Sequence, residues 1–295
     1  MNQEEQSYLN LLQNILDNGN TKEDRTGVGT KSIFGTNLRF SLKDNKIPLL
    51  TTKKVYLKGI VEELLFFLRG DTNTKLLEEK GVNIWKGNTT REFLDKKGLT
   101  YLPEGNMGLG YGHQWRSFNG YGKNLIDNTK FENDPGIDQV SQVINTLKTN
   151  PNDRRIIISA WNPSQLDQMA LPPCHVLAQF YVNNNKLSCQ WYQRSIDSLL
   201  GFGFNVASYA ILTKILAQTV GMEAEEVVFC GGDTHIYLNH IEQVKLQISR
   251  EPYEFPTLKI NKKLSTIKDI EELQFSNFEL SNYKCHPAIK AEMAI

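Results

Sequence analysis

A cysteine preceded by two prolines is the residue of this sequence best placed to act as a nucleophile. The segment LPPCHVLAQF sets Pro172 and Pro173 directly before Cys174, and the two rings favour an extended backbone at the thiol. A free thiol is largely protonated at neutral pH, so a catalytic cysteine needs a positive neighbour or a base. His175 is a poor candidate for that base, because adjacent side chains on a strand leave opposite faces.

A better partner for Cys174 is expected across a predicted β-hairpin. The runs HVLAQFYV and KLSCQWYQRS flank NNNK and have the composition of two paired strands, which brings Arg194 close to the start of the first strand. A guanidinium cannot act as a base, but it favours the thiolate and can also hold an anionic group of a substrate. Most cysteines are small buried hydrophobes, but the two prolines and the arginine across the turn favour a reactive thiol here.

Further cationic and polar residues could serve the same site. Arg25 in DRTG and the pair Arg154 and Arg155 in NDRRIIIS are candidates, because a phosphate dianion is well satisfied by several forked donors, although surface arginines are usually only solvated. Asn205 lies at a predicted helix start. It either caps that helix or uses its carboxamide to read the N3–H and O4 of a uracil ring, and the sequence leaves both open.

The composition bounds the class of protein. The 295 residues carry 33 Lys and Arg against 33 Asp and Glu, which gives no support to a broad nucleic-acid-binding face. The four cysteines form no C-x-x-C pair, so we expect no metal site and no disulfide framework. The segment MNQEEQSYLN lacks a signal-peptide pattern, and no apolar stretch reaches the roughly 18 residues of a membrane span. We therefore expect a soluble, cytoplasmic protein.

Apolar periodicity predicts the elements that position these residues. Helices are predicted where apolar residues recur at three-to-four spacing, at 6–19, 60–70, 138–150 and 206–221. Besides the hairpin, RRIIISAW and EVVFCGG have the composition of strands. The elements follow no steady βαβ rhythm and no linker interrupts them. We therefore predict one α+β domain over residues 1–295, with a large mixed or antiparallel sheet flanked by helices.

Taken together, these segments closely resemble the thymidylate synthase family over essentially the whole chain. Ten of them fall in the family's order at compatible spacing: DRTGVGT, TTKK, EELLFFLRGDTN, YGHQWR, RRIIISAWNP, PPCHVLAQFYV, QRSIDSLLGFGFN, GDTHIYLNH, REP and HPAIKAEMAI. The resemblance implies the thymidylate synthase fold and an obligate homodimer whose sheets pack face to face. It also implies that dUMP and the co-substrate 5,10-methylenetetrahydrofolate give dTMP and dihydrofolate.

The resemblance further implies catalytic roles. Cys174 matches the nucleophile that adds to C6 of the pyrimidine, and Asn205 with a water held by Glu63 matches the group that stabilises charge at O4. Desolvation on an apolar helix face should raise the pKa of Glu63. Tyr111 matches a residue associated with removal of the C5 proton. The catalytic set implied in this way is Cys174, Glu63, Tyr111, Arg194, Asn205 and Asp197.

Two ligand-binding sets are implied as well, with Arg154 and Arg155 supplied by the other subunit. His235 and Tyr237 match residues that bond the sugar 3′-hydroxyl, His175 matches part of a polar network near the pyrimidine, and Lys53 points toward the glutamate tail of folate. The dUMP set is Arg25, Arg154, Arg155, Gln193, Arg194, Ser195, Asp197, Asn205, His235 and Tyr237. The folate set is Lys53, Ile84, Trp85, Asp197, Leu200, Gly201, Phe204 and Ile295.

The C-terminal tail and several departures from the family pattern qualify this picture. The tail, ending at Ile295, would fold over both ligands and exclude water. Lys86 stands where an aspartate is common, Leu109-Gly110 replaces Pro-Val, and Tyr56 replaces a common histidine. Gly203 replaces a proline, which should free a folate-contacting loop. None of these changes removes an implied catalytic group.

Two other functions remain as alternatives. A dUMP hydroxymethylase of the same superfamily would let water, instead of hydride, capture the exocyclic methylene. Trp85 and the intact tail favour hydride transfer, because both can shield that intermediate from water. An RNA-binding regulator is the second alternative, and the zero net charge gives it no independent support.

Overall fold

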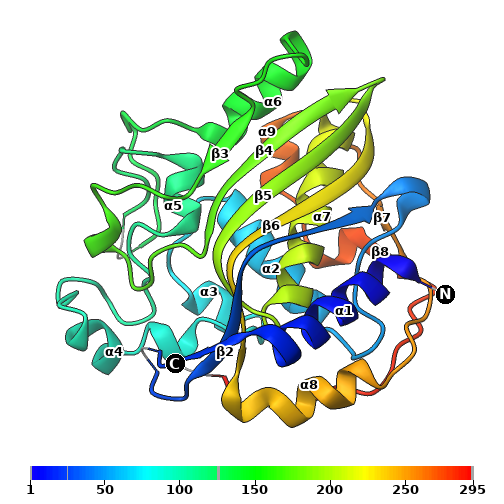
Figure 1. Cartoon of the computed structure of the whole chain (residues 1–295). Coiled ribbons are helices and arrows are strands. Elements are labelled where there is room, and N and C mark those ends of the chain that lie inside the picture. The colour runs from blue at the N-terminus through cyan, green and yellow to red at the C-terminus, as the bar shows by residue number, and fades with distance from the viewer. Residues whose placement is uncertain (1, 25, 125–126, 294–295) are drawn as a thin grey trace.

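A six-stranded mixed sheet forms the centre of the structure, which is a computed structural model describing residues 2–24, 26–124 and 127–293. Its spatial order is β1-β2-β6-β5-β4-β3 (Figure 1). β5 and β6 pair in parallel, and the other neighbouring strands pair antiparallel. A second sheet pairs β7 with β8. The strands are β1 (Asn20–Lys22), β2 (Thr30–Ser41), β3 (Ile157–Ser159), β4 (His175–Asn183), β5 (Lys186–Asp197), β6 (Glu223–Tyr237), β7 (Thr257–Ile260) and β8 (Phe278–Ser281).

Helices flank this sheet, which confirms the predicted α+β class. The α-helices are α1 (Gln3–Asn18), α2 (Leu57–Leu68), α3 (Lys75–Glu78), α4 (Arg91–Lys96), α5 (Tyr111–Arg116), α6 (Gln139–Thr149), α7 (Phe202–Thr219), α8 (Ile241–Ile248) and α9 (Ile267–Glu271). Short 3₁₀ turns are η1 (Lys43–Asn45), η2 (Lys86–Asn88), η3 (Leu166–Gln168), η4 (Leu238–His240) and η5 (Phe275–Asn277). Of the helices described, none has the length and apolarity that a membrane crossing needs.

The predicted helix ends are confirmed, but three of the four helix starts are not: α1, α2 and α7 begin at Gln3, Leu57 and Phe202, three or four residues before the predicted starts. Gly70 and Gly221, just beyond α2 and α7, have φ of 72° and 73°, a conformation that costs glycine little and other residues much. α7 begins at Phe202, so Asn205 lies inside its first turn and Gly201 is the N-cap. The capping alternative for Asn205 is therefore wrong. Gly203 also lies inside this first helical turn, not in a loop as expected from the sequence.

The predicted hairpin is formed by β4 and β5. Asn183 pairs with Lys186, and the two intervening residues, Asn184 and Asn185, have φ of 49° and 58°. Two residues in the left-handed region make the kind of turn whose twist matches the flanking strands, and asparagine is one of the residues that tolerates it. The register then places His175 opposite Gln193, so the end of β5 lies beside Cys174.

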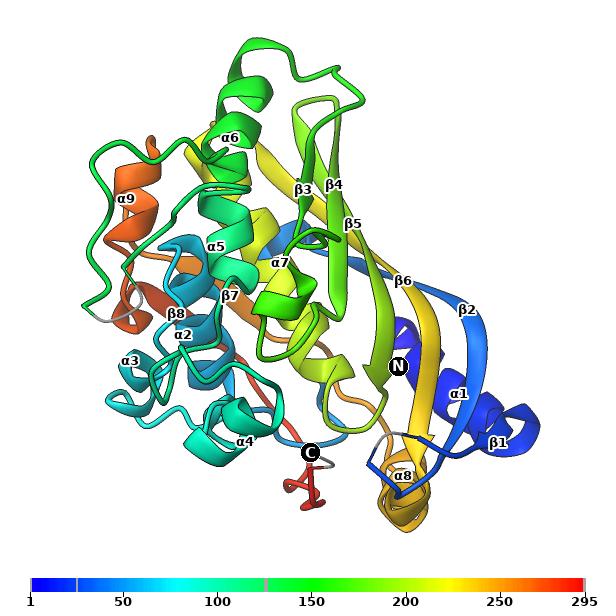
Figure 2. The same ribbon diagram turned by 90° about the vertical axis from the view of Figure 1, so that its left-hand side faces the viewer.

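The sheet has one covered and one open face. Figure 2 shows α2, α5, α6 and α7 on one side of the strands, where α7 is buried on nearly every side. Alternation along β4 and β5 turns Phe180 and Trp191 toward these helices. On the opposite side Leu177, Tyr181 and Tyr192 are 36%, 65% and 37% exposed. These three residues are called here the open face. No helix among the described elements packs against them.

A buried carboxylate fixes the loop between the first strands and α2. Glu5 of α1 is fully buried and accepts hydrogen bonds from the backbone N–H and the hydroxyl of both Thr51 and Thr52, at 2.6 to 3.0 Å. A buried charge is tolerated when several donors satisfy it in this way. The contact positions the next residue, Lys53.

Replacing Glu5 with alanine should destabilise the fold strongly, because four buried donors would lose their acceptor. We expect the free energy of unfolding to fall by about 3 kcal/mol or more. Urea unfolding followed by circular dichroism measures this change. The control is Asp17→Ala on the exposed side of the same helix, where a shift below about 0.5 kcal/mol is expected. Equal shifts in the two variants would contradict the role given to Glu5.

Candidate active site

The predicted contact between Cys174 and Arg194 is present. Nη2 of Arg194 lies 3.7 Å from Sγ of Cys174, and the backbone N–H of Arg194 donates to the Cys174 carbonyl at 3.0 Å. Cys174 is half-buried and immediately precedes β4. A guanidinium this close favours the thiolate over the thiol, which is the form that acts as a nucleophile.

The two prolines contribute carbonyl groups as well as stiffness. Nε of Arg194 donates to the carbonyl of Pro173 at 2.9 Å, and Nη2 donates to that of Pro172 at 3.0 Å. The guanidinium also lies 5.7 Å from the centre of the Trp161 ring. Because these contacts hold the fork in one orientation, the charge is fixed beside the sulfur. Trp161 is a site residue that the sequence reasoning missed, although it lies within the quoted RRIIISAWNP segment.

Tyr111 fixes the backbone of the cysteine from the helical side. Its hydroxyl oxygen accepts from the N–H of Cys174 at 2.7 Å and from the N–H of His175 at 3.3 Å. Burial raises the pKa of Tyr111 well above its usual value, so the phenol stays protonated. Tyr111 begins α5, and its ring stacks on Phe67 of α2 at 4.8 Å.

Glu63 is a buried carboxyl group with one strong hydrogen-bond donor beside it. The indole N–H of Trp85 donates to Oε1 of Glu63 at 2.7 Å. Burial raises the pKa of Glu63 to about 7, and the Trp85 hydrogen bond opposes that shift. A carboxyl group with this pKa can give and accept protons near neutral pH. The predicted direction of the pKa shift is confirmed.

Asn205 is oriented by a neighbouring amide. Its Nδ2 donates to Oε1 of Gln193 at 3.2 Å, and the same oxygen accepts from the indole of Trp191 at 3.3 Å. Because the oxygen of Gln193 is held by Trp191, the amide of Asn205 must present its nitrogen there and leave its own oxygen for other partners. This orienting contact was not predicted.

His175 cannot easily serve as a base. Its ring is buried between Tyr111 and Tyr209, at centroid distances of 5.3 and 5.4 Å. Burial lowers the pKa of His175 to about 4, and the Asn205 side chain opposes the shift only in part. The imidazole is therefore neutral at physiological pH and weakly basic, which is a second reason, beside the geometry of adjacent strand residues, against a cysteine–histidine pair.

The residues after β5 form a tight turn into α7. Oδ1 of Asp197 accepts from the N–H groups of Leu199 and Leu200 at 2.8 and 3.1 Å. The ammonium of Lys53 donates to the carbonyl of Leu199, and burial lowers its pKa to about 8 while Asp197 opposes the shift. Lys53 is thus buried against this turn in the structure.

Several residues of the predicted folate set are half-buried apolar side chains, and one of them, Trp85, contacts both Glu63 and Tyr111. Trp85 lies edge-on to Tyr111, with ring centroids 6.1 Å apart, and Gly201 is the N-cap of α7. The half-buried apolar members of the predicted folate set, which pack on the core, are Ile84, Trp85, Leu200 and Phe204. Their exposed portions offer a surface that suits a flat heterocycle.

The neighbouring strand places the predicted sugar-binding residues at the same end of the sheet. In the parallel pairing of β5 with β6, Asp197 lies opposite His235 and Ser195 lies opposite Asp233. His235 Nδ1 is 3.2 Å from Oδ1 of Asp233, and its ring lies edge-on to Tyr237 at 5.1 Å. These residues therefore lie beside the turn that follows Arg194.

Two predicted residues, Arg154 and Arg155, are not brought to this site within one chain. Arg154 and Arg155 are exposed, and the carbonyl of Arg154 accepts from Gln179, which lies about 13 Å along β4 from His175. Arg155 instead pairs with Asp153 at 2.8 Å. Arg25 and Ile295 lie outside the described residues. The described part of the chain contains no His, Cys, Asp or Glu cluster able to hold a metal ion.

Comparison with known proteins identifies the family. The family model described as thymidylate synthase matches residues 6–295. The chain belongs to the thymidylate synthase family. The thymidylate synthase of Saccharomyces cerevisiae is 49% identical to it, with 100% of this chain and 98% of the yeast protein covered. The human thymidylate synthase is 50% identical, with 99% of this chain and 91% of the human protein covered.

Bifunctional proteins are among the relatives of this thymidylate synthase family member. The bifunctional dihydrofolate reductase-thymidylate synthase of Leishmania major is 50% identical over 100% of this chain. The chain spans 56% of the length of that protein, and 62% of the length of the corresponding protein of Paramecium tetraurelia.

Removing the carboxylate of Glu63 should change how stability depends on pH. The pKa of about 7 lies above the ordinary 4.5, so the folded state binds this proton more tightly than the unfolded chain. Its contribution to stability is complete below pH 4.5 and is lost as pH rises through about 7. As pH rises through these two values, the free energy of unfolding of Glu63→Gln should therefore increase by about 3 kcal/mol relative to that of the parent protein.

Urea unfolding at a series of pH values and one fixed protein concentration measures this difference. Glu132→Gln, at an exposed position, is the control and should follow the parent protein at every pH. A Glu63→Gln curve parallel to that of the parent would show that the carboxyl group is not held in a desolvated state.

Proposed function

We propose that this protein converts dUMP and 5,10-methylenetetrahydrofolate to dTMP and dihydrofolate, with no metal, through covalent addition of Cys174 to the pyrimidine. Membership of the thymidylate synthase family supports this reaction. The structural observation that carries it is the 3.7 Å contact between the guanidinium of Arg194 and the sulfur of Cys174. Such a contact supports both a reactive thiolate and the capture of a phosphate.

The side chains divide the chemistry between them. Cys174 would attack C6 of the base, which makes C5 a carbon nucleophile. The oriented carboxamide of Asn205 would read the base, and Glu63, with its pKa of about 7, would move the proton at O4. Tyr111 keeps its own proton, so it would assist removal of the C5 proton by holding the accepting water.

The folate would supply the one-carbon unit and the hydride. The half-buried surfaces of Ile84, Trp85, Leu200 and Phe204 beside Gly201 fit such a ring. Lys53 could reach the glutamate tail only after leaving the carbonyl of Leu199. Asp197 would hold the turn between the two ligands through its bonds to Leu199 and Leu200, as part of the catalytic, dUMP and folate sets.

The remaining proposals concern the nucleotide and the tail. Gln193, Arg194, Ser195, His235 and Tyr237 lie together at one end of the sheet and would contact dUMP there, with Arg25 joining the phosphate. Before the terminal residue Ile295, the tail lies against the body: the carbonyl of Glu292 is 2.7 Å from Nε2 of His240. Closure of this segment over both ligands would exclude water.

Replacing Cys174 with alanine should abolish dTMP formation, because among the described residues no other cysteine has a contact with Arg194. We expect the rate to fall by at least about a thousandfold. The measurement is dihydrofolate production followed by its absorbance, and Cys285→Ala is the matched control that should keep near-normal activity. A Cys174→Ala enzyme that retained about a tenth of the parent rate would refute covalent catalysis by this residue.

The same assay separates the alternative reaction. A dUMP hydroxymethylase would return tetrahydrofolate and form no dihydrofolate. Trp85, next to Glu63 and Tyr111, is placed to shield an exocyclic methylene from water and so supports hydride transfer. Nothing in the charge balance supports an RNA-binding function.

We also propose that two copies associate through the open face, with Arg154 and Arg155 completing the phosphate site of the partner. Leu177, Tyr181 and Tyr192 give that face an apolar surface that a second copy could bury. The distance of both arginines from Cys174 within one chain supports donation across the interface. We also predict a single domain over residues 1–295, which the continuous hydrophobic core of the described residues supports. A cytoplasmic location is a further prediction.

Shared sites predict that two inactive variants rescue each other. In a mixed dimer of Cys174→Ala with the Arg154→Ala, Arg155→Ala double variant, one of the two sites regains every residue. Random mixing should restore about a quarter of the parent activity. The assay is dihydrofolate formation after co-refolding, and each variant refolded alone is the control. Mixtures no more active than the separate variants would contradict arginine donation between subunits.

A further inference from the structure

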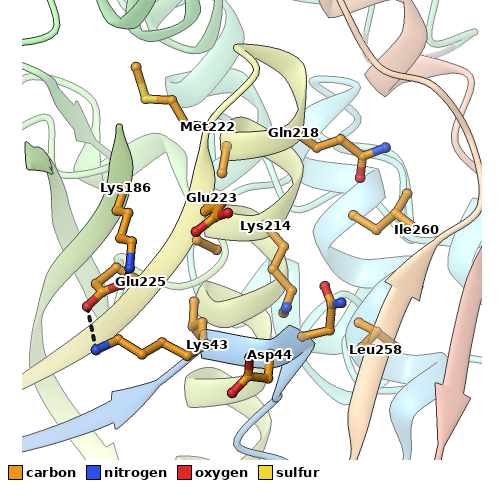
Figure 3. Close-up of a pocket in the computed structure, with 14 residues that line it drawn as sticks. Lys43, Asp44, Lys186, Lys214, Gln218, Met222, Glu223, Glu225, Leu258 and Ile260 are labelled. Atoms are coloured by element: carbon orange, nitrogen blue, oxygen red, sulfur yellow. Dashed lines mark ion pairs between the residues drawn. The ribbon is translucent and has the colours of Figure 1, made fainter. Parts of the chain in front are cut away.

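A cavity lies far from the proposed active site. It has a volume of about 540 Å³ and is framed by η1, the start of β5, the last turns of α7, the start of β6 and β7 (Figure 3). Lys186, which lines it, precedes Arg194 by eight residues on β5, or about 26 Å along the strand. The volume falls within the usual range for small-molecule sites.

One wall of the cavity carries a buried cation with no counter-ion. Lys214 of α7 is only 7% exposed, and it forms no ion pair or hydrogen bond with any described residue. Figure 3 shows its side chain extending from the helix across the cavity toward Asp44. Burial alone lowers the pKa of Lys214 to about 8, with no carboxylate opposing the shift. A buried lysine without a partner is costly to retain.

The other charged residues of the cavity are either paired or at its rim. Lys43 and Lys186 both pair with Glu225, at 2.8 and 3.4 Å. Asp44 and Glu223 are exposed. Lys214 is therefore the inner charge that a ligand can neutralise, whereas a second negative charge on the ligand would meet the carboxylates near the mouth.

The rest of the lining suits an apolar body. The apolar side chains that line the cavity are Leu42, Ala217, Met222, Ala224, Leu258 and Ile260. Lys214 also follows Asn205 by nine residues on α7, about 14 Å along the helix axis, so a ligand here would not enter the proposed nucleotide site.

We infer that this cavity is a second ligand site that takes a small monocarboxylate with a short apolar chain, its carboxylate paired with Lys214 and its chain against the apolar wall. The single ammonium group of Lys214 at the inner wall matches a ligand with a single negative charge. The acidic rim disfavours a phosphate dianion, and the apolar lining disfavours a carboxylate without a chain. Binding would supply the counter-ion that Lys214 lacks.

Hexanoate is the probe, and the ε-carbon NMR signal of Lys214 in ¹³C-lysine-labelled protein is the readout. Saturating dUMP is present throughout, so that the probe does not occupy the arginine site. Absence of the signal from Lys214→Met assigns it. We expect saturable binding in the millimolar range and an upward shift of the Lys214 pKa, because a paired carboxylate favours the ammonium. Hexanol, which has the same chain without the charge, should bind at least about tenfold more weakly.

Two cavity variants make the test specific. Calorimetry should show that Lys214→Met lowers hexanoate affinity at least about tenfold, while Lys186→Met, which removes a lysine already paired, changes it less than about twofold. Lys214→Gln is a second uncharged variant in case the methionine protein does not fold. Unchanged affinity in the Lys214 variants, equal losses in both positions, tighter binding of inorganic phosphate than of hexanoate, or no response of the Lys214 signal to hexanoate would each overturn the inference.

Discussion

The hydrogen bonds of one guanidinium hold the nucleophile segment in place. Arg194 reaches from β5 to the carbonyls of Pro172 and Pro173, and it also contacts the sulfur of Cys174. A proline cannot donate a backbone hydrogen bond, so the segment before β4 depends on accepting them. The same side chain therefore fixes the thiol in space and sets its electrostatic environment. Tyr111 secures the segment from the other side through the N–H of Cys174.

Most of the fold could be predicted, because its main determinants are local. The alternation of apolar residues and the two central asparagines specified the β4–β5 hairpin, and its register brought Arg194 to Cys174. The start of α7 could not be predicted in the same way. Asp197 caps the preceding turn through two backbone N–H groups, and the resulting helix begins at Phe202, earlier than apolar periodicity indicated.

The properties of site residues could be predicted where they depend on one helix or on two paired strands. They could not be predicted where they depend on segments that are far apart in the sequence. The pKa of Glu63 followed from a carboxyl group on an apolar helix face. The contact of Gln193 with Asn205 joins a strand to a helix, and no local pattern signals it. Burial of Lys53 against Leu199 likewise depends on the whole loop. Arg154 and Arg155 were implied by family resemblance alone, and in one chain the antiparallel pairing of β3 with β4 carries them away from Cys174.

The order of the strands also constrains how the protein folds. β5 and β6 run parallel, so the chain must return to the same end of the sheet before they can pair, and α7 is the segment that makes this return. The pairing of β5 with β6 therefore depends on where α7 packs. Because α7 also carries Asn205, a chain in which α7 has not yet packed against the sheet does not have its proposed base-reading residue in place. Such non-local strand pairing is intrinsically slow. A newly made chain would therefore be inactive until the β5–α7–β6 crossover has formed.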